Sequence, residues 1–548
     1  MNASVDVLQG ALGDAYQTHR VNLSLTPQGV TTLERVGIRW LQAAIDALLI
    51  DGESRRIEVI LGVSGVEPMP RGGWVQPGTA GGMYLDGEAV GRVSLVPLDG
   101  TADVLKRVVM LPSLVLMDGT GSVAFGGSHG RVGKLVGKAY GVLYDRAPVA
   151  LDTWKQFRNS RSANSARDAK ARMAPFATSS TAPGGENTAW FALHWLEPGG
   201  AEVWALEAAE IAKAAGYRVV ITVDQVAPQR WLERATEITD HVYLASNVLS
   251  EDDWGRFLRG VVEKFSPTFV MIHHSARAYE FLPELRHLRP DVTVLDSTHV
   301  VEHRTGGFVR PSIEYTSLID AHHVISPELR DLYLLDAGIN ADKVHYHPLI
   351  SSELEGQSVE PSAAAEEPLR VGFLGRIATQ KRPFLFVELA RRLNAKDTTG
   401  FEFILQGSGP LDGFLGRQIS RSGLDGVIQR RAWGPSEDFL NTVDVLVICS
   451  DNEGLTLTSL EADRHGVLVM SADVGSQATV VPETALLPRS PRAFLAGAER
   501  ELRRLANDRQ LLTEALKEQH DLVSALGVHD SASTFLQDFV ARTLGVTP

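Results

Sequence analysis

Hydrophobic and polar residues follow two different patterns along the chain. In the first third, residues 31–50 place apolar side chains at helical spacing on one face, and three short β-rich runs follow, separated by Gly and Pro clusters. From Thr188 onward, apolar runs of strand length alternate with helical patterns, as in the strand–helix–strand unit of residues 188–224. The chain therefore predicts a small α+β or mostly β domain followed by α/β units.

Two segments without apolar periodicity divide these regions. Residues 156–186 are rich in Ser, Ala, Arg, Pro and Gly, and residues 351–368 are acidic, so that both are expected to be linkers. The predicted organisation is an accessory domain over 1–155, a linker over 156–186, an N-terminal lobe over 187–350, a second linker over 351–368, a C-terminal lobe over 369–525 and a final helix over 526–548.

Composition narrows the class of protein. The 548 residues are enough for three or four domains, and a formal net charge of −14 disfavours nucleic-acid binding. A single cysteine, Cys449, excludes an internal disulfide framework and a Cys-rich zinc site, which favours a reducing cytoplasm. We expect neither a signal peptide nor a transmembrane segment, because the first residues lack a basic start and no run of 18 apolar residues occurs.

The most informative stretch is SDNEGLTLTSLEADRHGVLVMSADVGSQATVV, from Ser450 to Val481. It follows an apolar run that predicts a buried parallel strand, and it passes through a Gly turn into a short helix. Such a corner can bind an anion, because the first helical N–H groups have no intrahelical partner. Glu453 and Glu461 flank the turn. The alternative for the second acid is a capping box, in which Glu461 reaches back to the amide of Thr458.

Other candidate residues lie where predicted strands end. His299 and His274 end two strands of the N-terminal lobe, and open α/β folds bind ligands at this edge of the sheet. A satisfied structural histidine is the alternative for His299, and for His274 the alternative is that the neighbouring His273 faces the cleft. Gly199 and Gly200 lie between the first strand and the first helix of that lobe, where backbone amides can approach a ligand.

In the C-terminal lobe, Arg376 and Lys381 share the loop GRIATQKRP between a strand and a helix that starts at Pro383. Two cations on such a loop can neutralise a diphosphate, although isolated Arg and Lys side chains are mostly solvated.

These motifs resemble the donor-site signature of family 4 retaining glycosyltransferases of the GT-B fold. The matching elements are the E-x7-E spacing of Glu453 and Glu461, GGAE at 199–202 and GRxxxxKRP at 375–383. The resemblance covers about residues 188–525 and does not extend to the first third. It implies an α/β fold of two Rossmann-like lobes with an interlobe cleft, the nucleotide bound in the C-terminal lobe and the terminal helix crossing back to the N-terminal lobe.

The resemblance also implies roles for individual residues. Glu453 would contact hydroxyls of the donor sugar, Glu461 would hold the ribose, Arg376 and Lys381 would bind the pyrophosphate, and His299 would lie near the reacting carbon. The expected catalytic residues are His299, Glu453, Arg376 and Lys381. The expected donor-binding residues are Gly199, Gly200, Gly375, Arg376, Lys381, Trp433, Glu453, Gly454, Leu455, Thr456 and Glu461.

The implied reaction is transfer of a sugar, with retention of configuration, from a nucleotide-diphosphate sugar to a glycan, lipid-linked or protein acceptor. No cofactor is expected, and no metal, since the chain has no Asp-x-Asp pair to hold one at the diphosphate. The accessory domain leaves room for oligomers, and peripheral membrane contact is compatible with the chain. Two alternatives remain, a nucleotide-sugar epimerase and a non-catalytic GT-B scaffold or binding module.

Overall fold

The computed structural model describes residues 2–64, 87–100, 103–112, 140–159, 169–171, 186–302, 306–349, 367–395, 400–409, 411–526 and 529–545. Most of the two predicted linkers, at 160–168, 172–185 and 351–366, lies outside these ranges. Within them, no helix is long and apolar enough to cross a membrane.

In its described residues the first domain is α+β, one of the two classes expected. Its four-stranded sheet has the order β1-β3-β2-β4, in which β3 pairs antiparallel with β1 and β2, and β4 pairs parallel with β2. Its elements are α1 (Asn2–Ala15), β1 (His19–Leu25), α2 (Pro27–Val36), α3 (Ile38–Asp46), β2 (Arg56–Ser64), β3 (Gly87–Pro97) and β4 (Val104–Leu111).

The single helix predicted over residues 31–50 is wrong. Two helices, α2 and α3, meet at Gly37, whose φ of 90° is incompatible with a continuing α-helix. The apolar periodicity runs through the break, because both helices bury a face in the same core.

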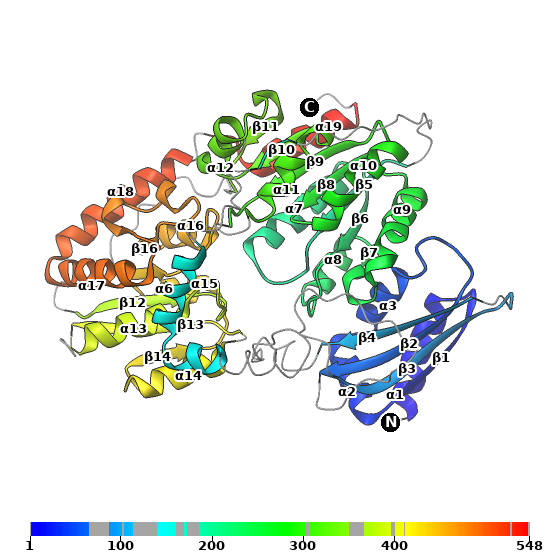
Figure 1. The fold of residues 1–548 in the computed structure, drawn as a ribbon, viewed down its shortest axis with the longest axis horizontal. Coiled ribbons are helices and arrows are strands. Elements are labelled where there is room, and N and C mark those ends of the chain that lie inside the picture. The colour runs from blue at the N-terminus through cyan, green and yellow to red at the C-terminus, as the bar shows by residue number, and fades with distance from the viewer. Residues whose placement is uncertain are drawn as a thin grey trace.

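The N-terminal lobe is built on a seven-stranded parallel sheet with the order β11-β10-β9-β8-β5-β6-β7. Helices lie along this sheet (Figure 1). Its strands are β5 (Thr188–Leu193), β6 (Arg218–Val223), β7 (Val242–Tyr243), β8 (Phe269–His273), β9 (Thr293–Thr298), β10 (Ala321–Val324) and β11 (Val344–Tyr346). Its α-helices are α7 (Gly200–Ala214), α8 (Leu232–Ile238), α9 (Trp254–Phe265), α10 (Ala276–Leu288), α11 (Val309–Glu314) and α12 (Pro327–Asp331).

The C-terminal lobe repeats the design with a six-stranded parallel sheet, in the order β14-β13-β12-β15-β16-β17. Its strands are β12 (Leu369–Leu374), β13 (Phe401–Gln406), β14 (Ile428–Arg431), β15 (Val445–Ile448), β16 (Leu468–Ala472) and β17 (Leu486–Leu487). Its helices are α13 (Pro383–Asn394), α14 (Asp412–Arg421), α15 (Ser436–Leu440), α16 (Leu457–Arg464), α17 (Pro491–Asn507) and α18 (Arg509–Leu526). The two Rossmann-like lobes of the predicted GT-B fold are confirmed.

The last helix, α19 (Ala532–Thr543), returns to the N-terminal lobe and packs on α7. Thr543 Oγ1 accepts a hydrogen bond of 3.0 Å from the Tyr217 hydroxyl, and the Ser533 hydroxyl donates one of 2.5 Å to Glu207 on α7. Figure 1 shows this helix beside green elements of the N-terminal lobe, away from α18.

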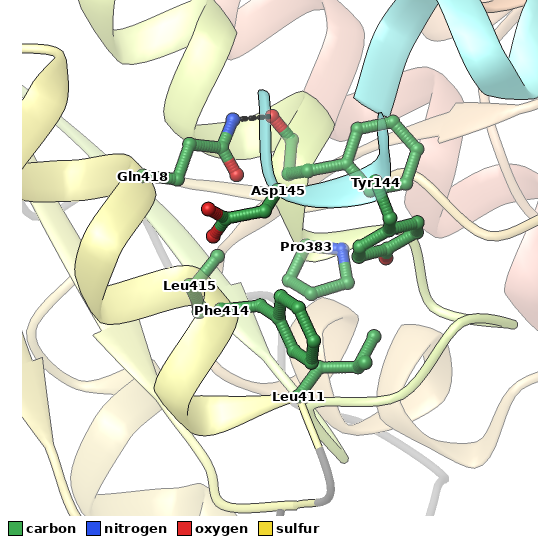
Figure 2. Close-up of a pocket in the computed structure, with 8 residues that line it drawn as sticks. Tyr144, Asp145, Pro383, Leu411, Phe414, Leu415 and Gln418 are labelled. Carbon is green, nitrogen blue, oxygen red and sulfur yellow. Dashed lines mark hydrogen bonds between the residues drawn. The ribbon is translucent and has the colours of Figure 1, made fainter. Parts of the chain in front are cut away.

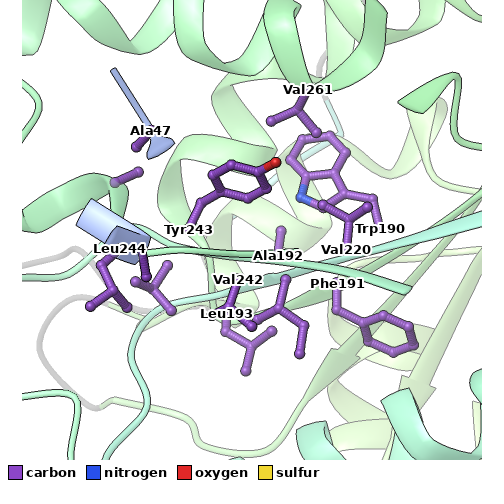
Figure 3. Close-up of a cluster of buried hydrophobic side chains, with 14 of the residues drawn as sticks. Ala47, Trp190, Phe191, Ala192, Leu193, Val220, Val242, Tyr243, Leu244 and Val261 are labelled. Carbon is purple, nitrogen blue, oxygen red and sulfur yellow. The ribbon is translucent and has the colours of Figure 1, made fainter. Parts of the chain in front are cut away.

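The accessory domain and the N-terminal lobe share one hydrophobic core. Ala47, just after α3, lies in the same buried cluster as Trp190 of β5 and Tyr243 of β7 (Figure 3). Polar contacts reinforce this interface: Trp40 Nε1 donates to the Pro228 carbonyl at 2.9 Å, and the buried Arg107 guanidinium binds the Asp253 carboxylate at 2.6 Å. The two units are therefore packed as one body.

A helix from the first third joins the opposite lobe. Helix α6 (Pro148–Asn159) crosses the boundary expected at residues 155 and 156, and it packs against α13 and α17 of the C-terminal lobe. Leu151 of α6 is buried in that lobe's core. The chain thus contacts the C-terminal lobe before it enters the N-terminal one (Figure 1).

Candidate functional site

The two lobes meet where the strands of their sheets end. Gly454 follows β15, and a Cβ atom at this position would lie 1.9 Å from the carbonyl oxygen of His299, which follows β9. Only glycine allows this approach of the two backbones. Nearby, Gly200 at the start of α7 lies against the side chain of Leu457 at the start of α16. The starts of two helices, one from each lobe, therefore lie at this junction.

Two loops of the C-terminal lobe are tied together at the junction. Lys381, in the loop after β12, donates to Glu453, in the loop after β15, with an Nζ–Oε1 distance of 2.6 Å. Beside this ion pair, the Asp451 amide donates to the Gln380 carbonyl at 2.8 Å, and the Gln380 side chain donates to the Asn452 carbonyl at 2.9 Å. The loops are adjacent because β12 and β15 are neighbouring strands.

Arg376 supplies a second positive charge at the same strand end. Its guanidinium lies over the ring of Trp195, 5.4 Å from the ring centroid, and forms no hydrogen bond or ion pair with any residue that the structure describes. Burial lowers the pKa of Arg376, with nearby acids such as Glu202 acting in the opposite direction. The guanidinium remains charged at neutral pH, so a partly buried cation with unused donors faces the junction.

Helix α16 begins at Leu457, with Thr456 as its N-cap, and no side chain caps its amides. The capping box expected as an alternative is wrong, because Thr458 lies inside the helix and its N-cap is two residues earlier. Glu461 is half-buried, and its carboxylate has no hydrogen-bond partner among the residues described. The helix start and Glu461 are both free to take a ligand.

His299 is buried beneath this junction. Its Nε2 lies 2.8 Å from the Ser297 hydroxyl, and its backbone amide donates to His274 Nε2 at 3.3 Å. Burial, with the neighbouring histidines His274 and His273 adding to it, holds the pKa of His299 well below its ordinary value. The imidazole is therefore neutral at pH 7, and its Nδ1 has no partner among the described residues.

The remaining predicted residues lie around these groups. Gly375 follows β12 with a φ of 150°, Leu455 is buried two residues before α16, and Gly199 is the N-cap of α7. Trp433 differs from them in burial, because its side chain is 55% exposed on the loop after β14. The structure thus gathers residues of both lobes at the junction and leaves Trp433 on the surface.

The structure adds two residues that the sequence patterns did not single out. Trp195 packs against Arg376 and donates to Glu202 at 2.6 Å, and Glu202 also contacts His194 at 3.1 Å. Both belong to the turn around Gly199 and Gly200, which the pattern marked only through its glycines. The available signal was Glu202, the acid of GGAE, which lies in the first turn of α7. A buried acid needs a hydrogen-bond partner, and Trp195 provides one.

Residues 368–504 match the family model of glycosyl transferases group 1. No curated protein matches the chain.

Three solved structures are among those to which the chain is similar. They are Anabaena Alr3699/HepE in complex with UDP (15% identity, TM-score 0.47, covering 65% of this chain and 99% of that one), sucrose-phosphate synthase from Thermosynechococcus elongatus (17%, 0.47, 66% and 98%) and the pneumococcal O-GlcNAc transferase GtfA in complex with UDP and GlcNAc (14%, 0.42, 55% and 62%).

The buried histidines predict how stability depends on pH. His273 is 3% exposed, burial places its pKa well below the ordinary value, and neither ring nitrogen has a described partner. The unfolded chain then binds a proton below about pH 6.5 that the folded chain does not, so stability is full above that pH and falls as the pH decreases. Replacing His273 with Phe should reduce the slope of unfolding free energy against pH by about 1.4 kcal/mol per unit below pH 6.

Urea unfolding of wild type and His273→Phe at pH 7 and pH 5 measures this difference. Asp224, whose pKa burial raises to about 6, contributes equally to both proteins and cancels. Equal pH dependence in the two proteins would show that folding does not lower the pKa of His273.

Proposed function

We propose that the chain is a retaining glycosyltransferase of family 4, which transfers a hexose from a nucleotide-diphosphate sugar to a carbohydrate, lipid-linked or protein acceptor. The observation that carries the proposal is the meeting of Arg376, the Lys381–Glu453 pair and the uncapped start of α16 at the junction of the two lobes. The family match of residues 368–504 covers the strands and loops that supply these groups.

The charge distribution suits a diphosphate. A nucleotide diphosphate gains negative charge as the bond to the sugar breaks, and fixed positive groups at that position lower the barrier. Arg376 offers bidentate donors, Lys381 offers a point charge, and the amides at the starts of α16 and α7 add the positive ends of two helices. In the proposal these groups act without a metal ion or cofactor.

The acids then bind the sugars of the donor. Lys381 neutralises Glu453 in the structure, and a donor would separate the pair by giving Lys381 a phosphate and Glu453 the hydroxyls of the transferred sugar. Glu461 lies on α16, which begins at the same turn, and it would hold the ribose. Backbone groups of the glycine turns and of the α16 start would line the donor: Gly199, Gly200, Gly375, Gly454, Leu455 and Thr456. Trp433 would lie against the base.

His299 orients substrates in this scheme. A neutral imidazole buried against Ser297 can donate or accept a hydrogen bond but carries no charge. The leaving phosphate takes the proton of the acceptor hydroxyl on the same face of the sugar, so that no side chain needs to act as general base. The accessory domain, packed on the N-terminal lobe, is the region of the chain that would select the acceptor or a partner subunit, and the reducing cytoplasm is the proposed compartment.

Nucleotide-sugar binding tests the donor site. Titration calorimetry with UDP-, GDP- and dTDP-sugars should identify one donor that binds the wild type, and Arg376→Ala should weaken that binding by tenfold to a hundredfold, because a charge-assisted hydrogen bond contributes roughly 1.5–3 kcal/mol. Glu453→Ala should weaken binding of the nucleotide sugar more than binding of the free nucleotide.

Arg391→Ala is the matched control, because Arg391 is an exposed arginine of the same lobe that pairs with Glu388 on α13. It should leave the Kd unchanged. Failure of all three donors to bind the wild type would favour a non-catalytic scaffold.

The stereochemistry of transfer tests the mechanism. Proton NMR of the first sugar released from the bound donor, recorded before the free sugar equilibrates, should show the anomeric configuration of the donor. Addition of a chelator should leave the rate unchanged. An inverted product would contradict retention, and release of a sugar epimerised at another carbon would assign the chain to the epimerases.

A further inference from the structure

A buried arginine supports the two loops of the proposed donor site. Arg382, next to Lys381, is fully buried at 0% exposure. Its guanidinium donates to the carbonyls of Cys449 at 2.5 Å and Ser450 at 2.6 Å, and to that of Arg489 at 2.9 Å. The backbone that leads from β15 into Glu453 is therefore held by this side chain.

A buried guanidinium also requires a negative partner, because an unpaired charge in the interior is costly. Two carboxylates are close: Asp152 at 3.4 Å and Asp451 at 3.7 Å. Asp152 is the nearer of the two. Asp451 is also shared with Arg489, which binds it at 2.9 Å. Asp152 lies on α6, a helix from the first third of the chain that precedes the first strand of both lobes in sequence.

A second residue of α6 reaches the same group. Gln156, one turn after Asp152 and hence on the same face of the helix, donates to Asp451 Oδ1 at 3.1 Å. Asp451 in turn is bound through its amide to Gln380, in the loop that carries Lys381. Asp152 thus contacts Arg382, which follows Lys381, and Gln156 contacts Asp451, which lies two residues before Glu453.

We propose that Asp152 and Gln156 are positioning residues of the donor site, which set the relative placement of the Lys381 and Glu453 loops through Arg382 and Asp451. This inference rests on the proposed function for the identity of the ligand, while its geometric part concerns the loops alone. Burial raises the pKa of Asp152 even though Arg382 acts to lower it, as expected for a carboxylate enclosed between the helix and the loop.

The segment before α6 provides a matched control. Tyr144 packs edge-on against Phe384 and Phe414, with Phe414 labelled beside it in Figure 2. Asp145 binds Arg417 at 2.9 Å and Arg421 at 2.5 Å on α14. These contacts fasten the segment to the C-terminal lobe through α13 and α14. Asp145 and Asp152 are therefore acids of the same segment. Asp145 binds arginines of α14, whereas Asp152 lies beside the buried Arg382.

Hydrogen–deuterium exchange of the full chain without ligand tests the geometric part. Asp152→Asn keeps the shape of the side chain and removes its charge, so exchange should rise in residues 449–454 and 379–382 and stay unchanged in β13 and α14. Gln156→Ala should give a smaller increase in the same residues, and it serves if Asp152→Asn does not fold. Asp145→Asn should leave these residues unchanged.

Binding of the nucleotide sugar identified by calorimetry tests the functional part. Asp152→Asn should raise its Kd by roughly threefold to tenfold, the range expected for a residue that acts through its neighbours, whereas Asp145→Asn should not change it. Unchanged exchange at 449–454 in both α6 variants, or exchange raised evenly over the lobe, would overturn the inference. If exchange changes locally but the wild type binds no nucleotide sugar, the proposed function fails and the loop-positioning role stands.

Discussion

The ion pair between Lys381 and Glu453 is the contact on which the site depends. It joins loops that are 72 residues apart in sequence, and it does so because the parallel strands β12 and β15 are neighbours and end at the same edge of the sheet. Each charge satisfies the other, and an unpaired Glu453 carboxylate would be costly, because its side chain is only 8% exposed. A ligand that carries both phosphates and hydroxyls can replace this pair with two better-matched partners.

The rest of the chain holds this pair in place from two sides. From the N-terminal lobe, the backbone of His299 packs against Gly454, so that the loop of Glu453 is fixed by the opposite sheet. On the C-terminal lobe, α6 contacts the buried Arg382. The accessory domain shares a core with one lobe while the helix that follows it is packed on the other, and the first third of the chain therefore bridges both lobes.

Local patterns were sufficient for most of the α/β part. The apolar run at residues 443–449 became the buried strand β15, and Pro383 begins α13, since both depend on short-range preferences. The break at Gly37 and the position of α6 were missed, because apolar spacing does not reveal a change in backbone direction or a partner hundreds of residues away. The resemblance to known glycosyltransferases predicted that Arg376, Lys381 and Glu453 belong to one site. The neutral state of His299 could not be predicted, because it depends first on the burial of the ring and then on histidines from separate strands, and only the fold creates both.

The most direct test is a crystal structure of the protein with the nucleotide-diphosphate sugar that it binds. The diphosphate should lie between Arg376 and the start of α16, with Lys381 on a phosphate oxygen and Glu453 on hydroxyls of the sugar. The Nζ–Oε1 distance between Lys381 and Glu453, 2.6 Å in the present structure, should then exceed hydrogen-bonding range. A nucleotide bound elsewhere, or a Lys381–Glu453 pair that stays intact with the donor in place, would contradict the account.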